Sequence, residues 1–395
     1  MNLVWLGGAT VLTLPAIFLR LTGSQFSPLV ASALFGLAIL GAAFLLTWAA
    51  EVAQVDISQS LALAFLAFVA VLPEYAVDLY FAWAAGQNPE YAHYAVANMT
   101  GGNRLLIGIG WTLVVFLFWV LRGRRGITID RSRGNDLAIL ALATLYAFTI
   151  PLKGSLSLFD TVVLLALFVT YLWKASRSEQ TEPELVGPPE MIASLTTTWR
   201  RAATLFMFLF SAALILSSAK PFAEGLVATG RSLGIDEFLL VQWLAPLASE
   251  APEIVVAAIF VARNSASLAL GTLVSSKVNQ WTLLVGTLPL VYSIASGSLT
   301  PLPLDGRQSE EVLLTAAQSA FAVSMLLNFN LSRLEAGVLF FMFAAQLVFS
   351  DPGIRYGFSA AYMVMTVVIL VRDRERLANL ALMLPWASGG SKTNQ

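Results

Sequence analysis

The segment Ser249-Glu250-Ala251-Pro252-Glu253 lies near the middle of an apolar run at about residues 237–262. A matching segment, Leu72-Pro73-Glu74, lies in a run at about 58–86. A proline inside a helix removes one backbone hydrogen bond and frees the carbonyl four residues earlier. A carboxylate at the membrane centre costs at least about 2.5–3.5 kcal/mol on insertion scales, so it is retained where it faces a cation, a partner or water. Glu74 and Glu253 are therefore the leading candidate functional residues.

A second pair of matching segments follows the first. It comprises Ala97-Asn98-Met99-Thr100-Gly101-Gly102-Asn103 and Gly271-Thr272-Leu273-Val274-Ser275-Ser276-Lys277-Val278-Asn279-Gln280, both rich in small and amide residues. The two copies are five predicted helices apart, and an odd number reverses the second copy in the membrane. Such an inverted repeat places ion sites near the bilayer midplane, where discontinuous helices expose carbonyls and helix ends to a cation.

The whole chain is strongly apolar. Hydrophobic residues make up 57% of its 395 residues and charged residues only 12%, with a mean hydropathy of +0.75, whereas soluble domains carry about 25% charged residues. Since a spanning helix needs about 20 mostly apolar residues, the sequence predicts an all-α integral membrane protein of about twelve transmembrane helices. The predicted runs are 3–22, 28–54, 58–86, 92–121, 135–151, 157–174, 201–233, 237–262, 265–297, 310–328, 332–349 and 355–371.

Composition also argues against several classes of function. A net charge of −1 provides no basic surface for nucleic acid. The absence of cysteine rules out disulfides and thiolate metal sites, and the single histidine, His93, argues against a two-histidine zinc motif. No hydrolase or protease motif is present in the sequence. We therefore expect neither an enzyme nor a bound cofactor.

The polar stretch near the middle of the chain predicts two halves. We expect an extra N-terminal helix in 1–27, a first repeat in 28–174, a cytoplasmic linker in 175–200, a second repeat in 201–349, and an extra helix with a cytoplasmic tail in 350–395. Loops after even-numbered runs carry about three times as many Lys and Arg residues as loops after odd-numbered runs. Positively charged loops stay in the cytoplasm, which predicts that both termini are cytoplasmic in a cell membrane.

These segments resemble the alpha repeats of the calcium:cation antiporter superfamily, which includes the sodium/calcium exchangers. The likeness covers about 68–106 and 246–286, and the helix pattern extends it over about 28–349. It implies a core of two inverted five-helix repeats, with one extra helix at each end. It also implies a secondary active antiporter that works by alternating access.

The resemblance also implies a set of ion ligands. Glu74 and Glu253 match the paired ion-binding glutamates, and Glu250 is an additional carboxylate where the family has serine. Further matching oxygen ligands are Ser249, Ser276, Asn98 and Asn103. The sequence departs from the family pattern at Ala70, Val71, Gly102, Leu106, Lys277 and Gln280.

Three charged residues near the motifs have alternative interpretations. Asp78 lies four residues after Glu74 on the same helical face. It is either a second ligand, a proton relay or a water-facing residue. Arg104 either neutralises Glu74 or Asp78 or reaches the membrane interface. Lys277 either stands in for one bound monovalent cation or pairs structurally with Glu250. The alternative to an ion site is that each glutamate only forms a structural ion pair. In that case Glu74 or Glu253 pairs with Arg104 or Lys277.

Carboxylate and carbonyl oxygens suit Ca²⁺ and Na⁺. We therefore predict a cation antiporter that exchanges Ca²⁺ for Na⁺, with Ca²⁺ or another cation exchanged for H⁺ as the first alternative. Two further hypotheses are a cation sensor that has kept the exchanger fold and a cation channel. The expected partners are inorganic cations (Ca²⁺, Na⁺ or H⁺) and the lipid bilayer, with no nucleic acid.

Overall fold

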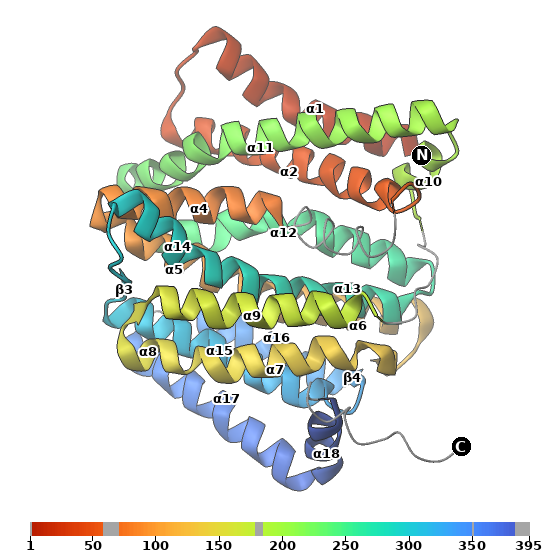
Figure 1. Ribbon diagram of the computed structural model, residues 1–395, viewed down its shortest axis with the longest axis vertical. Coiled ribbons are helices and arrows are strands. Elements are labelled where there is room, and N and C mark those ends of the chain that lie inside the picture. Colours follow the sequence, from red (N-terminus) through yellow and green to blue (C-terminus); the bar gives the residue numbers. More distant parts are fainter. Residues whose placement is uncertain (1, 58–70, 178–184, 350, 384–395) are drawn as a thin grey trace. The chain divides into compact units, whose positions relative to one another are not determined.

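The computed structural model describes residues 2–57, 71–177, 185–349 and 351–383, and these residues are mostly helical (Figure 1). Within them, eight helices are long and apolar enough to cross a membrane. The chain is an integral membrane protein, as predicted. The first part of the predicted run 58–86, residues 58–70 with Ala70, lies outside the described residues.

The helices of the first half follow the predicted runs closely. They are α1 (Asn2–Thr22), α2 (Pro28–Ala53), α4 (Leu72–Gln87), η1 (Pro89–Tyr91), α5 (Ala92–Leu105), η2 (Leu106–Trp111), α6 (Thr112–Arg122), η3 (Arg131–Arg133), α7 (Gly134–Ala147), α8 (Thr149–Lys153) and α9 (Leu158–Ala175).

The second half continues in the same way. Its helices are α10 (Pro188–Ala193), α11 (Thr197–Leu233), α12 (Glu237–Ala262), α13 (Ala266–Asn279), η4 (Gln280–Leu284), α14 (Val285–Ser296), α15 (Gly306–Leu326), α16 (Arg333–Val348), α17 (Pro352–Arg372) and α18 (Arg374–Met383). One expectation is wrong here: α12 is continuous through Pro246 and Pro252. Each proline removes a hydrogen bond without interrupting this helix.

Two short antiparallel strand pairs join loops that are distant in sequence. Strand β1 (Gly126–Thr128) pairs with β4 (Asn330–Ser332), and β2 (Ser155–Leu156) pairs with β3 (Leu302–Pro303). The sequence analysis did not predict these strands, because runs of two or three residues carry no measurable periodicity.

The chain forms two compact units. The first unit comprises Met1–Gly102, Ser176–Val255 and Ile294–Gly297. In it α2 and α11 run side by side (Figure 1). Small residues allow this close approach, because a Cβ on Gly36 would lie 2.8 Å from the ring of Phe222 and one on Gly225 would lie 2.9 Å from Ser32.

The second unit comprises Asn103–Ala175, Val256–Ser293 and Ser298–Gln395. Helix α15 packs against α7 and α17 in this unit, and α16 packs against α6. Helix α18 is fixed to the end of α15 by Arg376, whose guanidinium donates to the carbonyls of Ser324 (2.9 Å) and Met325 (2.7 Å). These are among the last carbonyls of α15, which have no partner within the helix.

Part of the predicted linker is folded. Helix α10 buries Pro188, Pro189 and Ile192, and Ile192 belongs to an apolar cluster with Trp48 and Met207. Next to it, Asp56 forms ion pairs with Arg200 (2.8 Å) and Arg201 (2.9 Å) at the start of α11. The hydrogen bonds from Arg200, followed by those from Arg201, lower the pKa of Asp56 from 3.8 to about 2.

This ion pair makes a testable contribution to stability. Because the pKa of Asp56 is lower in the folded protein, the pair stabilises the fold above about pH 4 and loses its effect as the pH falls through about 2. We expect Asp56→Asn to lower the free energy of unfolding in detergent by about 0.2–1 kcal/mol at pH 7, and by less at pH 3. Glu375→Gln, at an exposed acid of α18, is the control. An equal loss at both pH values would contradict the assignment.

Candidate cation site

Helix α4 brings two acidic residues into the interior of the first unit. Glu74 lies in its first turn, where the helix dipole favours a negative charge. Asp78 lies one turn later on the same face. Glu74 is 5% exposed and Asp78 is 1% exposed, so both carboxyl groups are removed from solvent.

Helix α12 contributes the second set of oxygen atoms. Ser249, Glu250 and Glu253 are all buried. The carboxyl group of Glu74 lies close enough to those of Glu250, Glu253 and Asp78 to interact with their charges. The first unit therefore brings Glu250, Glu253 and Asp78 each near Glu74, from two separate helices.

The closeness of Glu74 and Glu250 has a chemical consequence. An ionised carboxylate is only an acceptor, whereas a protonated carboxyl group also has one O–H donor. Two buried carboxyl groups this close repel each other when both are ionised, so a proton held between them or a bound cation stabilises the pair. The pair can release that proton when a cation arrives to compensate its charge.

Helix α5 adds amide oxygens beside the carboxyl groups. The side chain of Asn98 lies beside the carboxyl group of Asp78. Among the described residues, neither Oδ1 of Asp78 nor Oδ1 of Asn98 has a hydrogen-bond partner. Oxygen atoms of both kinds are ligands of hard cations. The described side chains contain no group of three or more acidic or histidine residues placed to hold a metal ion.

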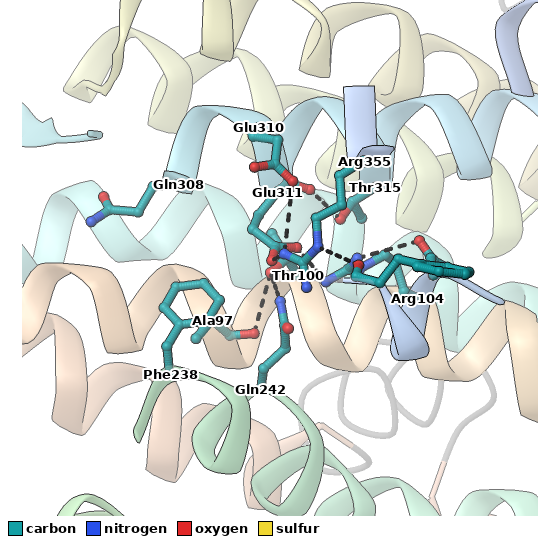
Figure 2. Close-up of polar contacts among 12 residues, drawn as sticks. Ala97, Thr100, Arg104, Phe238, Gln242, Gln308, Glu310, Glu311, Thr315 and Arg355 are labelled. Atoms are coloured by element: carbon teal, nitrogen blue, oxygen red, sulfur yellow. Dashed lines mark hydrogen bonds and ion pairs between the residues drawn. The ribbon is translucent and has the colours of Figure 1, made fainter. Parts of the chain in front are cut away.

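Proline and glycine set the distance between α5 and α12. Pro246 has no N–H, so the carbonyl of Gln242 lacks its usual helical partner. Gly101 packs on that carbonyl so closely that a Cβ would lie 1.8 Å from its oxygen. The side chain of Gln242 also donates to the hydroxyl of Thr100 over 3.4 Å (Figure 2). A Cβ on Gly102 would lie 3.3 Å from Oε1 of Glu250.

Three other predicted site residues lie in the second unit. Lys277 Nζ donates to Oδ1 of Asn103 over 2.6 Å and to its backbone oxygen over 3.2 Å. The ammonium also lies 4.4 Å from the ring centre of Trp281, which is within the range of a cation–π interaction. Ser276, the residue before Lys277, is also buried. The pairing of Lys277 with Glu250 or Glu253 stays a prediction.

Arg104 belongs to a buried ion-pair network that sequence reasoning missed. Its guanidinium pairs with Glu311, and Glu311 also pairs with Arg355 (Figure 2). Arg104 is 1% exposed, so the interpretation that it reaches the membrane interface is wrong. Two adjacent glutamates at the start of the predicted run 310–328 were the available signal.

The two alpha-repeat segments share an unusual backbone feature. Helix α5 passes into the π-helix η2 and then into α6, and α13 passes into the π-helix η4 and then into α14. Short π-helical turns inside α-helices are frequent at functional sites. Each π-helix contains one buried tryptophan, Trp111 in the first and Trp281 in the second. The likeness of the two segments thus extends from sequence to backbone geometry.

Comparison with known proteins agrees with these features. A family described as "Sodium/calcium exchanger protein" matches residues 27–176 and 203–350. The chain belongs to this family, and so to the calcium:cation antiporter superfamily. The predicted family is confirmed, and the chain is a member of a transporter family.

Solved structures give the same result. The crystal structure of the H⁺/Ca²⁺ exchanger CAX is 47% identical, with a TM-score of 0.93 over 97% of each chain. The sodium-calcium exchanger NCX_Mj is 18% identical, with a TM-score of 0.54 over 82% of this chain and 98% of that one. YfkE is 13% identical, with a TM-score of 0.61 over 94% and 99%. The latter two share the fold alone. No curated protein sequence matches the chain.

The contact between Gly101 and Gln242 can be tested by adding one methyl group. We expect Gly101→Ala to separate α5 from α12 and to destabilise the protein by about 1–3 kcal/mol or more, because the carbonyl of Gln242 cannot move away as a flexible side chain would. Gly102→Ala is the matched neighbour and should be better tolerated, since its nearest contact is the flexible end of the Glu250 side chain at 3.3 Å and Pro246 lies at an ordinary contact distance of 3.6 Å. Thermal unfolding in detergent measures both. Equal stability of Gly101→Ala and the parent chain would contradict the packing.

Proposed function

We propose that this protein is a secondary antiporter that exchanges Ca²⁺ for H⁺ across a membrane. The observation that carries the proposal is the closeness of the buried carboxyl groups of Glu74 and Glu250, because a proton held between them removes the repulsion of two buried negative charges. The 47% identity to the H⁺/Ca²⁺ exchanger CAX supports it. The sequence alone favoured Na⁺ as the coupling ion, with H⁺ as the alternative, and these two observations favour the alternative.

The exchange follows from competition for the same oxygen atoms. A carboxyl oxygen that holds a proton cannot bind Ca²⁺ well, and Ca²⁺ prefers several carboxylate, carbonyl and hydroxyl oxygens. Binding of Ca²⁺ therefore expels the proton that Glu74 and Glu250 share. Two protons carry the same charge as one Ca²⁺, so the carboxyl groups of Glu74, Glu250 and Glu253 can be compensated in either state.

The proposed ligands in the first unit are carboxyl, amide and hydroxyl groups. Glu74 and Glu253 bind the cation directly, and Glu250 shares the exchanged proton. Asp78 and Asn98 supply further oxygen atoms or pass the proton on, and Ser249 supplies a hydroxyl. From the family motif we also propose Asn103 and Ser276 as ligands.

Lys277 gives a reason for coupling to protons rather than Na⁺. It stands where the family motif has an asparagine, and its ammonium is a permanent positive charge. We propose that this charge takes the place of one bound monovalent cation. Its bond to Asn103 keeps it in place. Arg104 sets the local charge next to Asn103 in the same way.

The organisation proposed for the chain follows the inverted repeat. Residues 28–174 and 201–349 form the two repeats, 175–200 joins them in the cytoplasm, and 1–27 and 350–395 carry the additional helices. With an odd number of helices between the motifs, we propose that the repeats have opposite orientations and both termini are cytoplasmic. The excess of Lys and Arg in the loops after even-numbered runs supports this orientation in a cell membrane.

Flux in liposomes tests the proposed exchange. The purified chain is reconstituted with a Ca²⁺ indicator inside, and either a pH gradient or a Na⁺ gradient is imposed. We expect Ca²⁺ to accumulate against its own gradient when the lumen is acidic, and the Na⁺ gradient to have little effect. Accumulation driven only by Na⁺ would support the first sequence prediction instead. Downhill movement alone would indicate a channel, and no movement would indicate a sensor.

The same assay tests the role of Glu253. Glu253→Gln keeps the shape of the side chain and removes its charge, so we expect exchange to fall by at least about a hundredfold while the protein stays folded; a loss of charged-ligand binding of about 3 kcal/mol corresponds to that factor. Glu90→Gln, at an exposed acid of η1, is the matched control and should exchange normally. Unchanged exchange by Glu253→Gln would remove Glu253 from the mechanism.

A further inference from the structure

Four buried charged side chains form connected ion pairs in the second unit. Arg355 of α17 pairs with Glu311 of α15 and lies 3.7 Å from Glu310, and Glu311 pairs in turn with Arg104 of α5 (Figure 2). All four side chains are at most 3% exposed. Two positive and two negative charges balance each other here. Since breaking a buried pair by removing one partner is strongly destabilising, these residues hold α5, α15 and α17 in a fixed arrangement.

Two glutamines close a ring around Arg104. Its guanidinium donates to Oε1 of Gln346 over 3.4 Å. The amide of Gln346 donates to Oε1 of Gln318 over 3.3 Å. Gln318 completes the ring by donating to the backbone oxygen of Arg104, also over 3.3 Å. Both the side chain and the main chain of Arg104 are therefore held by the same two amides.

The ring lies at the junction between α5 and the π-helix η2. The backbone changes from α-helix to π-helix directly after Leu105, and such a change disturbs the regular pairing of carbonyls with amides one turn later. Gln318 supplies a donor to the carbonyl of Arg104 at this junction. The residue before Arg104 is Asn103, whose two oxygens hold the ammonium of Lys277. A fixed Arg104 thus fixes the acceptors of Lys277.

We propose that Arg104, Glu311, Arg355, Gln318 and Gln346 form a positioning network for transport, which acts on the ammonium of Lys277 through the backbone and side chain of Asn103. The inference rests on the proposed function, in which Lys277 supplies a permanent charge. It also gives α17 a role in transport: Arg355 lies beyond residue 350, where the match to the exchanger family ends.

Comparison of single and double variants tests this proposal. The Ca²⁺ concentration at half-maximal exchange is measured in liposomes for the parent chain, Lys277→Asn, Gln318→Leu and their combination. Gln318→Leu removes the donor to Arg104 and leaves every charge paired. We expect each single variant to change the half-saturating Ca²⁺ concentration by at least about threefold in the same direction. The double variant should change it no further, because two residues that act through one group are not additive.

A second variant and a control complete the experiment. Gln346→Leu opens the same ring at its other amide and should have the same effect as Gln318→Leu. It takes the place of Gln318→Leu if that variant does not fold. Arg376→Gln breaks the contacts of α18 with the end of α15. It should lower the thermal stability without changing the half-saturating Ca²⁺ concentration.

The outcomes separate the two proposals. If the parent chain exchanges Ca²⁺ for H⁺ and the effects of Gln318→Leu and Lys277→Asn multiply in the double variant, the positioning role is wrong while the proposed function stands. The positioning role would also be wrong if Arg376→Gln changed the half-saturating Ca²⁺ concentration as much as Gln318→Leu does. Loosening α15 at any point would then be enough to change that concentration. If the parent chain does not exchange, the proposed function fails, and the positioning role fails with it.

Discussion

A carboxyl group inside a membrane protein must hold a proton or lie beside a cation, because an uncompensated buried charge costs several kcal/mol. The two units of this chain meet that constraint differently. In the first unit, we propose that the neighbouring carboxyl groups of Glu74 and Glu250 share a proton, which a metal ion can replace. In the second unit, Glu311 lies between Arg104 and Arg355, whose charges are permanent. The first arrangement suits exchange, and the second suits a fixed scaffold.

Proline and glycine bring α5 against α12, the helix that carries Glu250 and Glu253. Pro246 leaves the carbonyl of Gln242 without a helical donor, and Gly101 lets α5 approach that carbonyl more closely than any residue with a Cβ could. The same approach places Gly102 against Glu250. Backbone contact of this kind is rigid, since interiors are closely packed. The geometry of the carboxyl groups therefore depends on the small residues of the alpha-repeat motif as much as on the acidic ones.

Much of this could be predicted from the sequence, because apolar run length and proline-glutamate symmetry are physical requirements of a repeated membrane fold. The extent of α12 and the burial of Glu74 and Glu253 follow from them. Other features depend on partners far away in the sequence. The sequence left Arg104 either beside Glu74 or Asp78 or at the membrane interface, whereas its observed partner, Glu311, is 207 residues away. The continuity of α12 at Pro252 and the π-helices were also missed, since neither has a local sequence signal that periodicity detects.

The central claim is that Glu74 and Glu250 share a proton that Ca²⁺ displaces. Infrared difference spectroscopy of the detergent-solubilised protein, recorded without and with Ca²⁺ at one pH, observes this step directly, because protonated and ionised carboxyl groups absorb at different frequencies. Our account predicts that Ca²⁺ removes a protonated-carboxyl band and that this band change is absent in Glu74→Gln. A band of protonated carboxyl that persists at saturating Ca²⁺, or an unchanged difference spectrum in Glu74→Gln, would contradict it.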